Sequence, residues 1–152
     1  MPHTEEEDKP CRACTDFKSW AKQQSKASLA PQNKSPAHPP DCPLDKEDLG
    51  HSTWGFLHSM AAYYPQKPTE NQEKDMKKFF HIFAEFYPCE PCALDFWDDI
   101  QENPPQTRSR DALSKWLCDR HNTVNKKLGK PMFDCSMVTE RWREGWKDGS
   151  CD

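Results

Sequence analysis

Residues 76–92, MKKFFHIFAEFYPCEPC, decide the fold expected for this chain of 152 residues. Large apolar side chains recur in the first part of the stretch at the three- and four-residue spacing of an α-helix. They are Met76, Phe79, Phe80, Phe83 and Phe86. Pro88 would end that helix, and Pro91 suits the first turn of another. The stretch therefore predicts two consecutive helices whose junction carries a C-x-x-C pair, Cys89 and Cys92.

The Cys89–Cys92 pair predicts thiol–disulfide chemistry. Two intervening residues let the sulfurs meet in a small ring, and disulfides of this kind open and close readily. The amides and the positive dipole end at a helix start would favour a thiolate at either cysteine. A structural disulfide or half of a zinc site is the alternative, but zinc needs four ligands and no second C-x-x-C lies at finger spacing. A thioredoxin-like fold is disfavoured because this motif lies among helices rather than in a βαβ unit.

Outward from this junction, helical periodicity accounts for residues 45–146, and no stretch alternates like a strand. We therefore expect an all-α protein, a four-helix bundle plus a short fifth helix. The expected helices run from Asp45 to Pro65, from Thr69 to Pro88, from about Pro91 to Ile100 and from Ser109 to Leu128, and the last short one carries Val138 and Trp142. Connections this short favour antiparallel neighbours.

The first part of the chain differs in composition from the rest. Residues 1–20 form an N-terminal segment with a second C-x-x-C, Cys11 and Cys14, which suggests an electron relay between two dithiols. Residues 21–41 are rich in Pro, Ser, Lys and Gln and are expected to be a flexible linker. A flexible chain between Cys14 and Cys42 has a root-mean-square end-to-end distance of roughly 30 Å. Residues 42–152 are expected to form the folded domain.

Charge and hydropathy exclude some classes of function. The formal net charge of −4 gives no field that favours nucleic acid. No window approaches the roughly 20 consecutive apolar residues of a membrane span. No secretory signal or transit peptide is recognised at the N-terminus. Eight cysteines without a secretory signal predict an oxidising compartment outside the secretory route.

The other cysteines are interpreted by their positions. Cys118 and Cys135 flank the connection after the fourth helix, and a disulfide between them would add about 3 kcal/mol in the chain-entropy model. We interpret this pair as structural. Cys42 and Cys151 lie at the two edges of the domain, where cysteines often join chains, so a homodimer linked twice through them is expected.

The end of the fourth helix combines a histidine, amides and lysines. His121 and the nearby lysines can be a core histidine and cations that complement the helix dipole. Together with Trp54, His58 and Trp142, they suggest flat rings for a heteroaromatic group and cations for a pyrophosphate. No G-x-G-x-x-G occurs, so a dinucleotide would bind without a Rossmann fold.

Several strings of the chain resemble the Erv/ALR family of FAD-linked sulfhydryl oxidases. They include YPCEPCA at residues 87–93, DCP at 41–43, AAYYP at 61–65, the pattern from Cys118 to Cys135 and RWREGWKDGSC at 141–151. The likeness covers residues 41–152 almost continuously, and a short leader at 11–18 is also similar. It implies FAD held in a helical bundle, in a covalent homodimer of the mitochondrial intermembrane space.

The resemblance also implies roles for individual residues. Cys92 would be the flavin-proximal sulfur and Cys89 the interchange sulfur, while Cys11 and Cys14 would be the shuttle. The residues that match FAD-lining positions are Gly50, Trp54, His58, Tyr87, Cys92, His121, Asn122, Val124, Asn125, Lys127, Lys130, Arg141 and Trp142. Cys118–Cys135 would be the structural disulfide and Cys42–Cys151 the intersubunit one.

The implied reaction takes electrons from substrate dithiols to FAD and then to O2 or cytochrome c, in support of oxidative protein folding and import. The implied partners are the import oxidoreductase of the intermembrane space and its twin-cysteine client proteins. Two alternatives remain, a non-catalytic disulfide-braced helical module with growth-factor-like binding and a zinc-stabilised interaction domain. A shorter form that begins near Asp41, with a cytosolic or secreted location, also stays open.

Overall fold

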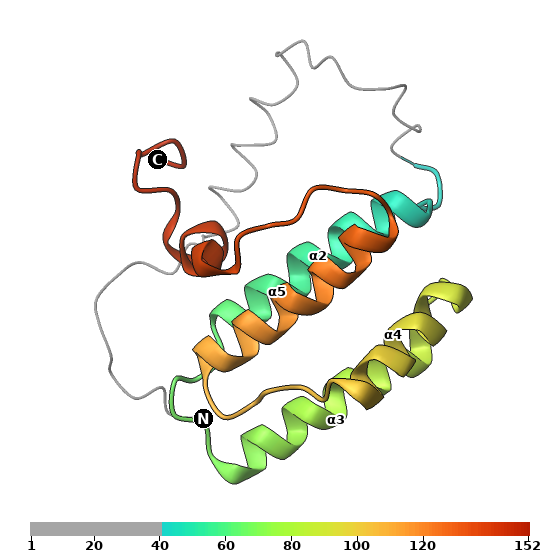
Figure 1. Ribbon diagram of the computed structural model, residues 1–152, viewed down its shortest axis with the longest axis horizontal. Helices are drawn as coiled ribbons and strands as arrows, with labels where there is room; N and C mark the ends of the chain where they lie inside the picture. The colour runs from blue at the N-terminus through green and yellow to red at the C-terminus, as the bar shows by residue number, and fades with distance from the viewer. Residues whose placement is uncertain (1–40) are drawn as a thin grey trace. The chain divides into compact units, whose positions relative to one another are not determined.

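The computed structural model describes residues 41–152, which form four α-helices followed by two short helical turns and contain no strand (Figure 1). The elements are α2 (Lys46–Ala62), α3 (Glu70–Phe86), α4 (Glu90–Glu102), α5 (Arg110–Lys127), the 3₁₀ turn η2 (Cys135–Met137) and the π-helical turn η3 (Glu140–Glu144). The predicted all-α class is confirmed. The predicted N-terminal segment and nearly all of the predicted linker lie outside the described residues.

Local sequence signals fix where three of the four helices begin. The side chains of Asp45, Thr69 and Ser109 each accept a hydrogen bond from a backbone N–H of the first turn, and Thr69 forms a full capping box. After α5, Gly129 adopts φ 68°, the left-handed conformation that commonly ends a helix. α4 begins at Glu90, one residue before the predicted start, and extends two residues beyond the predicted end.

The helices pack as two pairs, α2 with α5 and α3 with α4 (Figure 1). One apolar core joins the pairs. Its buried side chains are Leu57, Ala61, Tyr64, Phe80, Ala84, Ile100, Leu113, Trp116 and Leu117. Burial of such side chains is the main stabilising term of a small bundle.

The aromatic side chains of α3 divide into two stripes. Phe80 and Ala84 point into the core, whereas Phe79, Phe83 and Phe86 lie on the neighbouring stripe and line a groove. Phe86, predicted with the others at the apolar spacing, is 74% exposed because it is the last residue of the helix. The sequence period shows which residues recur, but it does not separate these two faces.

The predicted last short helix is irregular in the structure. η2 contacts α5 and η3 contacts α2, so the C-terminal part lies against the α2–α5 pair. Val138 between the turns is buried, and Trp142 lies in η3. None of the helices in residues 41–152 has the length and hydropathy that a bilayer-crossing segment requires.

Candidate functional site

Cys89 and Cys92 form a disulfide at the start of α4. Cys89 is the residue that precedes the first turn, and Pro91 lies inside that turn. The two Cα atoms are 5.2 Å apart. Both cysteines are half-buried, so a partner thiolate can reach them. The unpaired amides and the positive dipole end of α4 lie at this disulfide and favour a thiolate released there.

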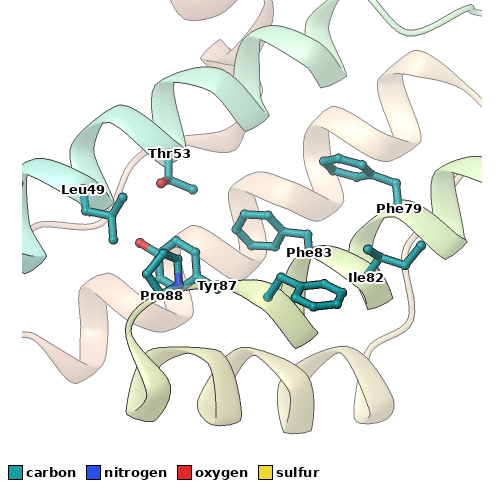
Figure 2. Close-up of a pocket in the computed structure, with 8 residues that line it drawn as sticks. Leu49, Thr53, Phe79, Ile82, Phe83, Tyr87 and Pro88 are labelled. Atoms are coloured by element: carbon teal, nitrogen blue, oxygen red, sulfur yellow. The ribbon is translucent and has the colours of Figure 1, made fainter.

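The two residues before this disulfide are held by neighbouring helices. Tyr87 and Pro88 line an apolar groove of about 320 Å³ together with Leu49 and Thr53 of α2 and Phe83 of α3 (Figure 2). The ring centroids of Phe83 and Tyr87 lie 5.2 Å apart. The approach to the disulfide therefore faces the same groove as the first half of α2.

Two ion pairs join α4 to α5. Asp95, one turn after Cys92, pairs with Lys127 in the last turn of α5. Asp99 accepts a hydrogen bond from Arg120 at 2.8 Å, and both side chains are largely buried. Figure 1 shows the start of α2, the start of α4 and the end of α5 at one end of the bundle. The disulfide is thus placed beside α2 and α5.

A cluster of stacked rings joins α2, α5 and η3. The rings of Trp54 and His121 are parallel with centroids 4.0 Å apart, and those of His58 and Trp142 are parallel at 4.7 Å. His58 Nε2 and His121 Nδ1 share a hydrogen bond of 2.9 Å. The Arg141 guanidinium lies 4.1 Å from the centroid of the Trp142 ring. We call these five side chains the ring cluster.

Both histidines of the ring cluster are uncharged at neutral pH. Burial lowers the pKa of His58 to about 3, with smaller contributions from His121 and Arg141. The pKa of His121 is lowered to about 4, mainly by burial and to a smaller extent by the charge of Lys130. Because the two facing nitrogens share one hydrogen, one ring donates and the other accepts. The ring cluster therefore offers flat, neutral surfaces with cations at its edge.

Asn122 holds the chain that follows α5. Its Oδ1 accepts a hydrogen bond from the Phe133 backbone N–H at 2.9 Å, and its Nδ2 donates to the Phe133 carbonyl at 2.8 Å. The disulfide between Cys118 and Cys135, with Cα atoms 5.8 Å apart, ties down the same segment. The oxygen and the nitrogen of this buried side-chain amide are thus both engaged in holding the chain at Phe133.

The structure brings some of the predicted cofactor residues together and separates others. Trp54, His58, His121, Arg141 and Trp142 form the ring cluster. Gly50 lies one turn before Trp54 on α2, and a Cβ built on it would meet no atom within 4 Å, so the helix surface there is open.

The remaining predicted cofactor residues lie nearer the end of α5 and the groove. Val124 and Asn125 are half-buried on α5, and Lys130 is exposed. Lys127 is engaged by Asp95. Tyr87 lines the groove, and Cys92 belongs to the disulfide.

Sequence reasoning missed Leu49 and Thr53, which line the groove, and the Arg120–Asp99 pair. Leu49 and Thr53 are four positions apart and therefore share one face of α2. This helical spacing was the signal that could have identified them. Cys42 and Cys151 are exposed, and Cys11 and Cys14 lie outside the described residues. Within residues 41–152, no group of three or more His, Cys, Asp or Glu side chains is arranged to hold a metal ion.

These features define a class, an all-helical protein with a C-x-x-C disulfide at a helix start beside a cluster of neutral rings. A model of the Erv1 / Alr family matches residues 51–143. The mitochondrial FAD-linked sulfhydryl oxidase ERV1 of Saccharomyces cerevisiae is 52% identical over 106 residues, which cover 70% of this chain and 56% of that protein. The FAD-linked sulfhydryl oxidase ERV1 of Arabidopsis thaliana is 48% identical over 111 residues, which cover 72% and 58% of the two chains.

A solved structure agrees with the sequence comparisons. The crystal structure of the FAD binding domain of Erv1 from Saccharomyces cerevisiae superposes with a TM-score of 0.67 at 51% identity, over 69% of this chain and 100% of that one. The chain therefore belongs to the Erv1 / Alr family. It spans little more than half the length of the two full-length relatives.

Proposed function

We propose that this chain is a FAD-dependent sulfhydryl oxidase, which forms disulfides in substrate dithiols and delivers the electrons to O2 or cytochrome c. The observation that carries the proposal is the Cys89–Cys92 disulfide at the start of α4, packed beside the two helices that hold the ring cluster. Membership of a family whose named relatives are FAD-linked sulfhydryl oxidases supports it.

The side chains of the ring cluster and the cations near it fit FAD. Neutral, parallel rings suit a flat heteroaromatic group, and the exposed cations Lys130 and Arg141 suit a pyrophosphate. Bound FAD would supply a two-electron acceptor that no protein side chain offers. The residues proposed to hold it are Gly50, Trp54, His58, Tyr87, Cys92, His121, Val124, Asn125, Lys127, Lys130, Arg141 and Trp142, with Asn122 shaping the rim through its hold on Phe133.

The disulfide exchange itself needs only the substrate's two thiols and Cys89 and Cys92 of this chain. A substrate thiolate attacks Sγ of Cys89, which breaks the Cys89–Cys92 bond and releases a Cys92 thiolate. The second substrate thiolate then attacks the substrate sulfur of the mixed disulfide and releases Cys89. The substrate thus loses two electrons and two protons, and the cysteine pair is reduced. The start of α4 stabilises the thiolate that is left at Cys92.

Purification of the full chain followed by visible spectroscopy tests the proposal. We expect a yellow protein with about one flavin per chain that consumes O2 when dithiothreitol is added. A folded, colourless chain without dithiol oxidation would exclude the oxidase and leave the binding-module alternative. Metal analysis of the same sample would identify a zinc-stabilised domain.

We further propose that Cys11 and Cys14 act as a shuttle between protein substrates and Cys89–Cys92. The leader around them is similar to that of the long form of augmenter of liver regeneration, the mitochondrial animal member of the family. The proposed partners are the import oxidoreductase of the intermembrane space and its twin-cysteine clients. Replacing both cysteines by Ser should slow oxidation of such a partner much more than oxidation of dithiothreitol. Equal slowing of the two substrates would contradict a shuttle.

The proposal includes a homodimer joined by Cys42–Cys151 disulfides and a mitochondrial location. Both cysteines are exposed at the edges of the described residues, and the Saccharomyces cerevisiae relative is named mitochondrial. A dimer that survives non-reducing electrophoresis and is lost with Cys42→Ser would support the linkage. A non-covalent dimer with both sulfurs reduced would exclude it. Import of the tagged chain into isolated mitochondria tests the location.

A further inference from the structure

One face of α4 carries an exposed stripe that begins between the two cysteines of the disulfide. Glu90, Leu94, Trp97 and Asp98 recur at three- and four-residue spacing and therefore share this face. Leu94 is 60% exposed and Trp97 is 40% exposed. We call these four residues the α4 stripe. It presents two large apolar side chains flanked by carboxylates within about two turns of the disulfide.

The α4 stripe is acidic as well as apolar. α4 contains five carboxylates and no lysine or arginine. Asp95 and Asp99 pair with Lys127 and Arg120 of α5. The other three carboxylates are exposed, and no ion pair within residues 41–152 engages them. They are Glu90, Asp98 and Glu102. The surface of α4 beside the disulfide therefore carries three carboxylates without an ion-pair partner among residues 41–152.

One apolar side chain of the α4 stripe, Trp97, is held by a contact with α3. The ring of Trp97 meets that of His81 of α3 edge to face, with centroids 5.6 Å apart. This contact limits the freedom of the indole while leaving part of it exposed. A partly ordered aromatic surface loses less conformational entropy on binding than a free one.

We propose that the α4 stripe docks the segment around a substrate's dithiol and selects segments that are cationic and carry an aromatic side chain near the cysteines. This inference rests on the proposed oxidase function and adds a substrate class to it. An aromatic side chain covers Leu94 and Trp97, and cations face Glu90 and Asp98.

Residues 9–22 of this chain, KPCRACTDFKSWAK, are a segment of that chemistry and serve as the model substrate. They hold four cations and one carboxylate. Phe17 and Trp20 follow Cys14 by three and six positions. Docking holds the dithiol for the exchange described above, in which a substrate disulfide forms, the Cys89–Cys92 bond breaks, and two electrons and two protons pass to the cysteine pair.

The test separates docking from chemistry by using a peptide of residues 9–22 with Ser in place of both cysteines. The protein is residues 41–152, because its core lies within α2–α5 and the matching domain of the Saccharomyces cerevisiae relative was crystallised on its own. Titration calorimetry should detect binding that weakens about fivefold with Asp98→Lys and more with Trp97→Ala. A peptide with Glu at positions 18 and 22 should bind at least fivefold more weakly.

Asp75→Lys is the matched control, because it makes the same charge change on an exposed position of α3. The Asp75→Lys variant should bind the peptide with an affinity within twofold of that of the unmodified protein. Only the Asp98→Lys variant should show a weaker dependence of peptide binding on salt concentration. Circular dichroism checks that Trp97→Ala is folded, and Asp98→Lys tests the same stripe through an exposed residue. Equal binding by the two lysine variants, or no binding at all, would overturn the inference. Absence of flavin and of dithiothreitol oxidation would instead overturn the oxidase function.

Discussion

The two disulfides of the described chain lie in contrasting surroundings. Cys89 and Cys92 are separated by two residues, lie at the start of α4 and are half-buried. Cys118 and Cys135 are 17 positions apart, and Cys118 is only 2% exposed inside α5. The first disulfide closes only a short loop, so removing it frees little chain, whereas removing the second releases the chain between α5 and η2. The first is therefore arranged for exchange and the second for stability.

The neighbours of each disulfide follow the same division. The second one is held by a side chain of α5, since Asn122 Nδ2 donates a hydrogen bond to Cys135 Sγ at 3.4 Å. The first has unpaired helix amides on one side and the apolar groove before it. A thiolate is favoured more strongly at the first disulfide, because Cys118 lies inside α5 and Cys135 begins only a single 3₁₀ turn, which has little dipole.

The largest expected effect comes from removing the reactive sulfur. Cys92→Ala should lower dithiol oxidation by at least a hundredfold, because the leaving thiolate of the exchange is lost. Its free energy of unfolding should stay within about 1 kcal/mol, because a short disulfide loop constrains the unfolded chain little. Oxygen consumption with dithiothreitol and urea unfolding measure the two quantities. Substantial turnover by Cys92→Ala would remove the distinction between the two disulfides.

The second prediction concerns the Cys118–Cys135 disulfide, whose removal should lower stability but leave activity nearly unchanged. Replacing both Cys118 and Cys135 by Ala should lower the free energy of unfolding by about 3 kcal/mol, because a loop of this length is no longer closed. Dithiol oxidation at 25 °C should remain within a few-fold, because neither sulfur takes part in exchange. Urea unfolding and initial rates check this. A stable but inactive double variant would mean that this disulfide is also redox-active.

The parts of this arrangement that depend on local sequence were predictable. Asp45, Thr69 and Ser109 cap helices through their own first turns, and Pro91 places the helix start at the C-x-x-C pair. Such signals act over three or four residues and need no knowledge of the partner helices.

The parts that depend on the rotation of one helix against another were not predictable. Phe86 shares the apolar spacing of Phe80 but lies on the groove side, and only the packed structure separates the two. Asn122 turns toward the backbone of Phe133, a contact across eleven residues that no local period specifies. The Arg120–Asp99 pair likewise requires the register of α5 on α4.

Acid should weaken the ring cluster without acting on either disulfide directly. The pKa of His58 is about 3 in the folded chain and near 6.5 when unfolded, so the unfolded chain binds more protons below pH 6.5. The free energy of unfolding should therefore fall as pH decreases, by about 2 kcal/mol from pH 7 to 5 for this group alone. Urea unfolding at several pH values measures it. His58→Gln should flatten the slope, and an unchanged slope would contradict the low pKa of His58.

The smallest expected effect concerns the exposed ion pair that lies closest to the reactive disulfide. Lys127→Ala should lower the free energy of unfolding by less than about 0.5 kcal/mol, because solvent screens the Lys127–Asp95 pair. Lys115→Ala is the matched control, because Lys115 also forms an exposed ion pair on α5, but with Asp119 of the same helix rather than with α4. Equal, small losses would indicate that groove packing, rather than this ion pair, holds the start of α4. A loss above about 1 kcal/mol for Lys127→Ala alone would show instead that the pair positions the disulfide helix.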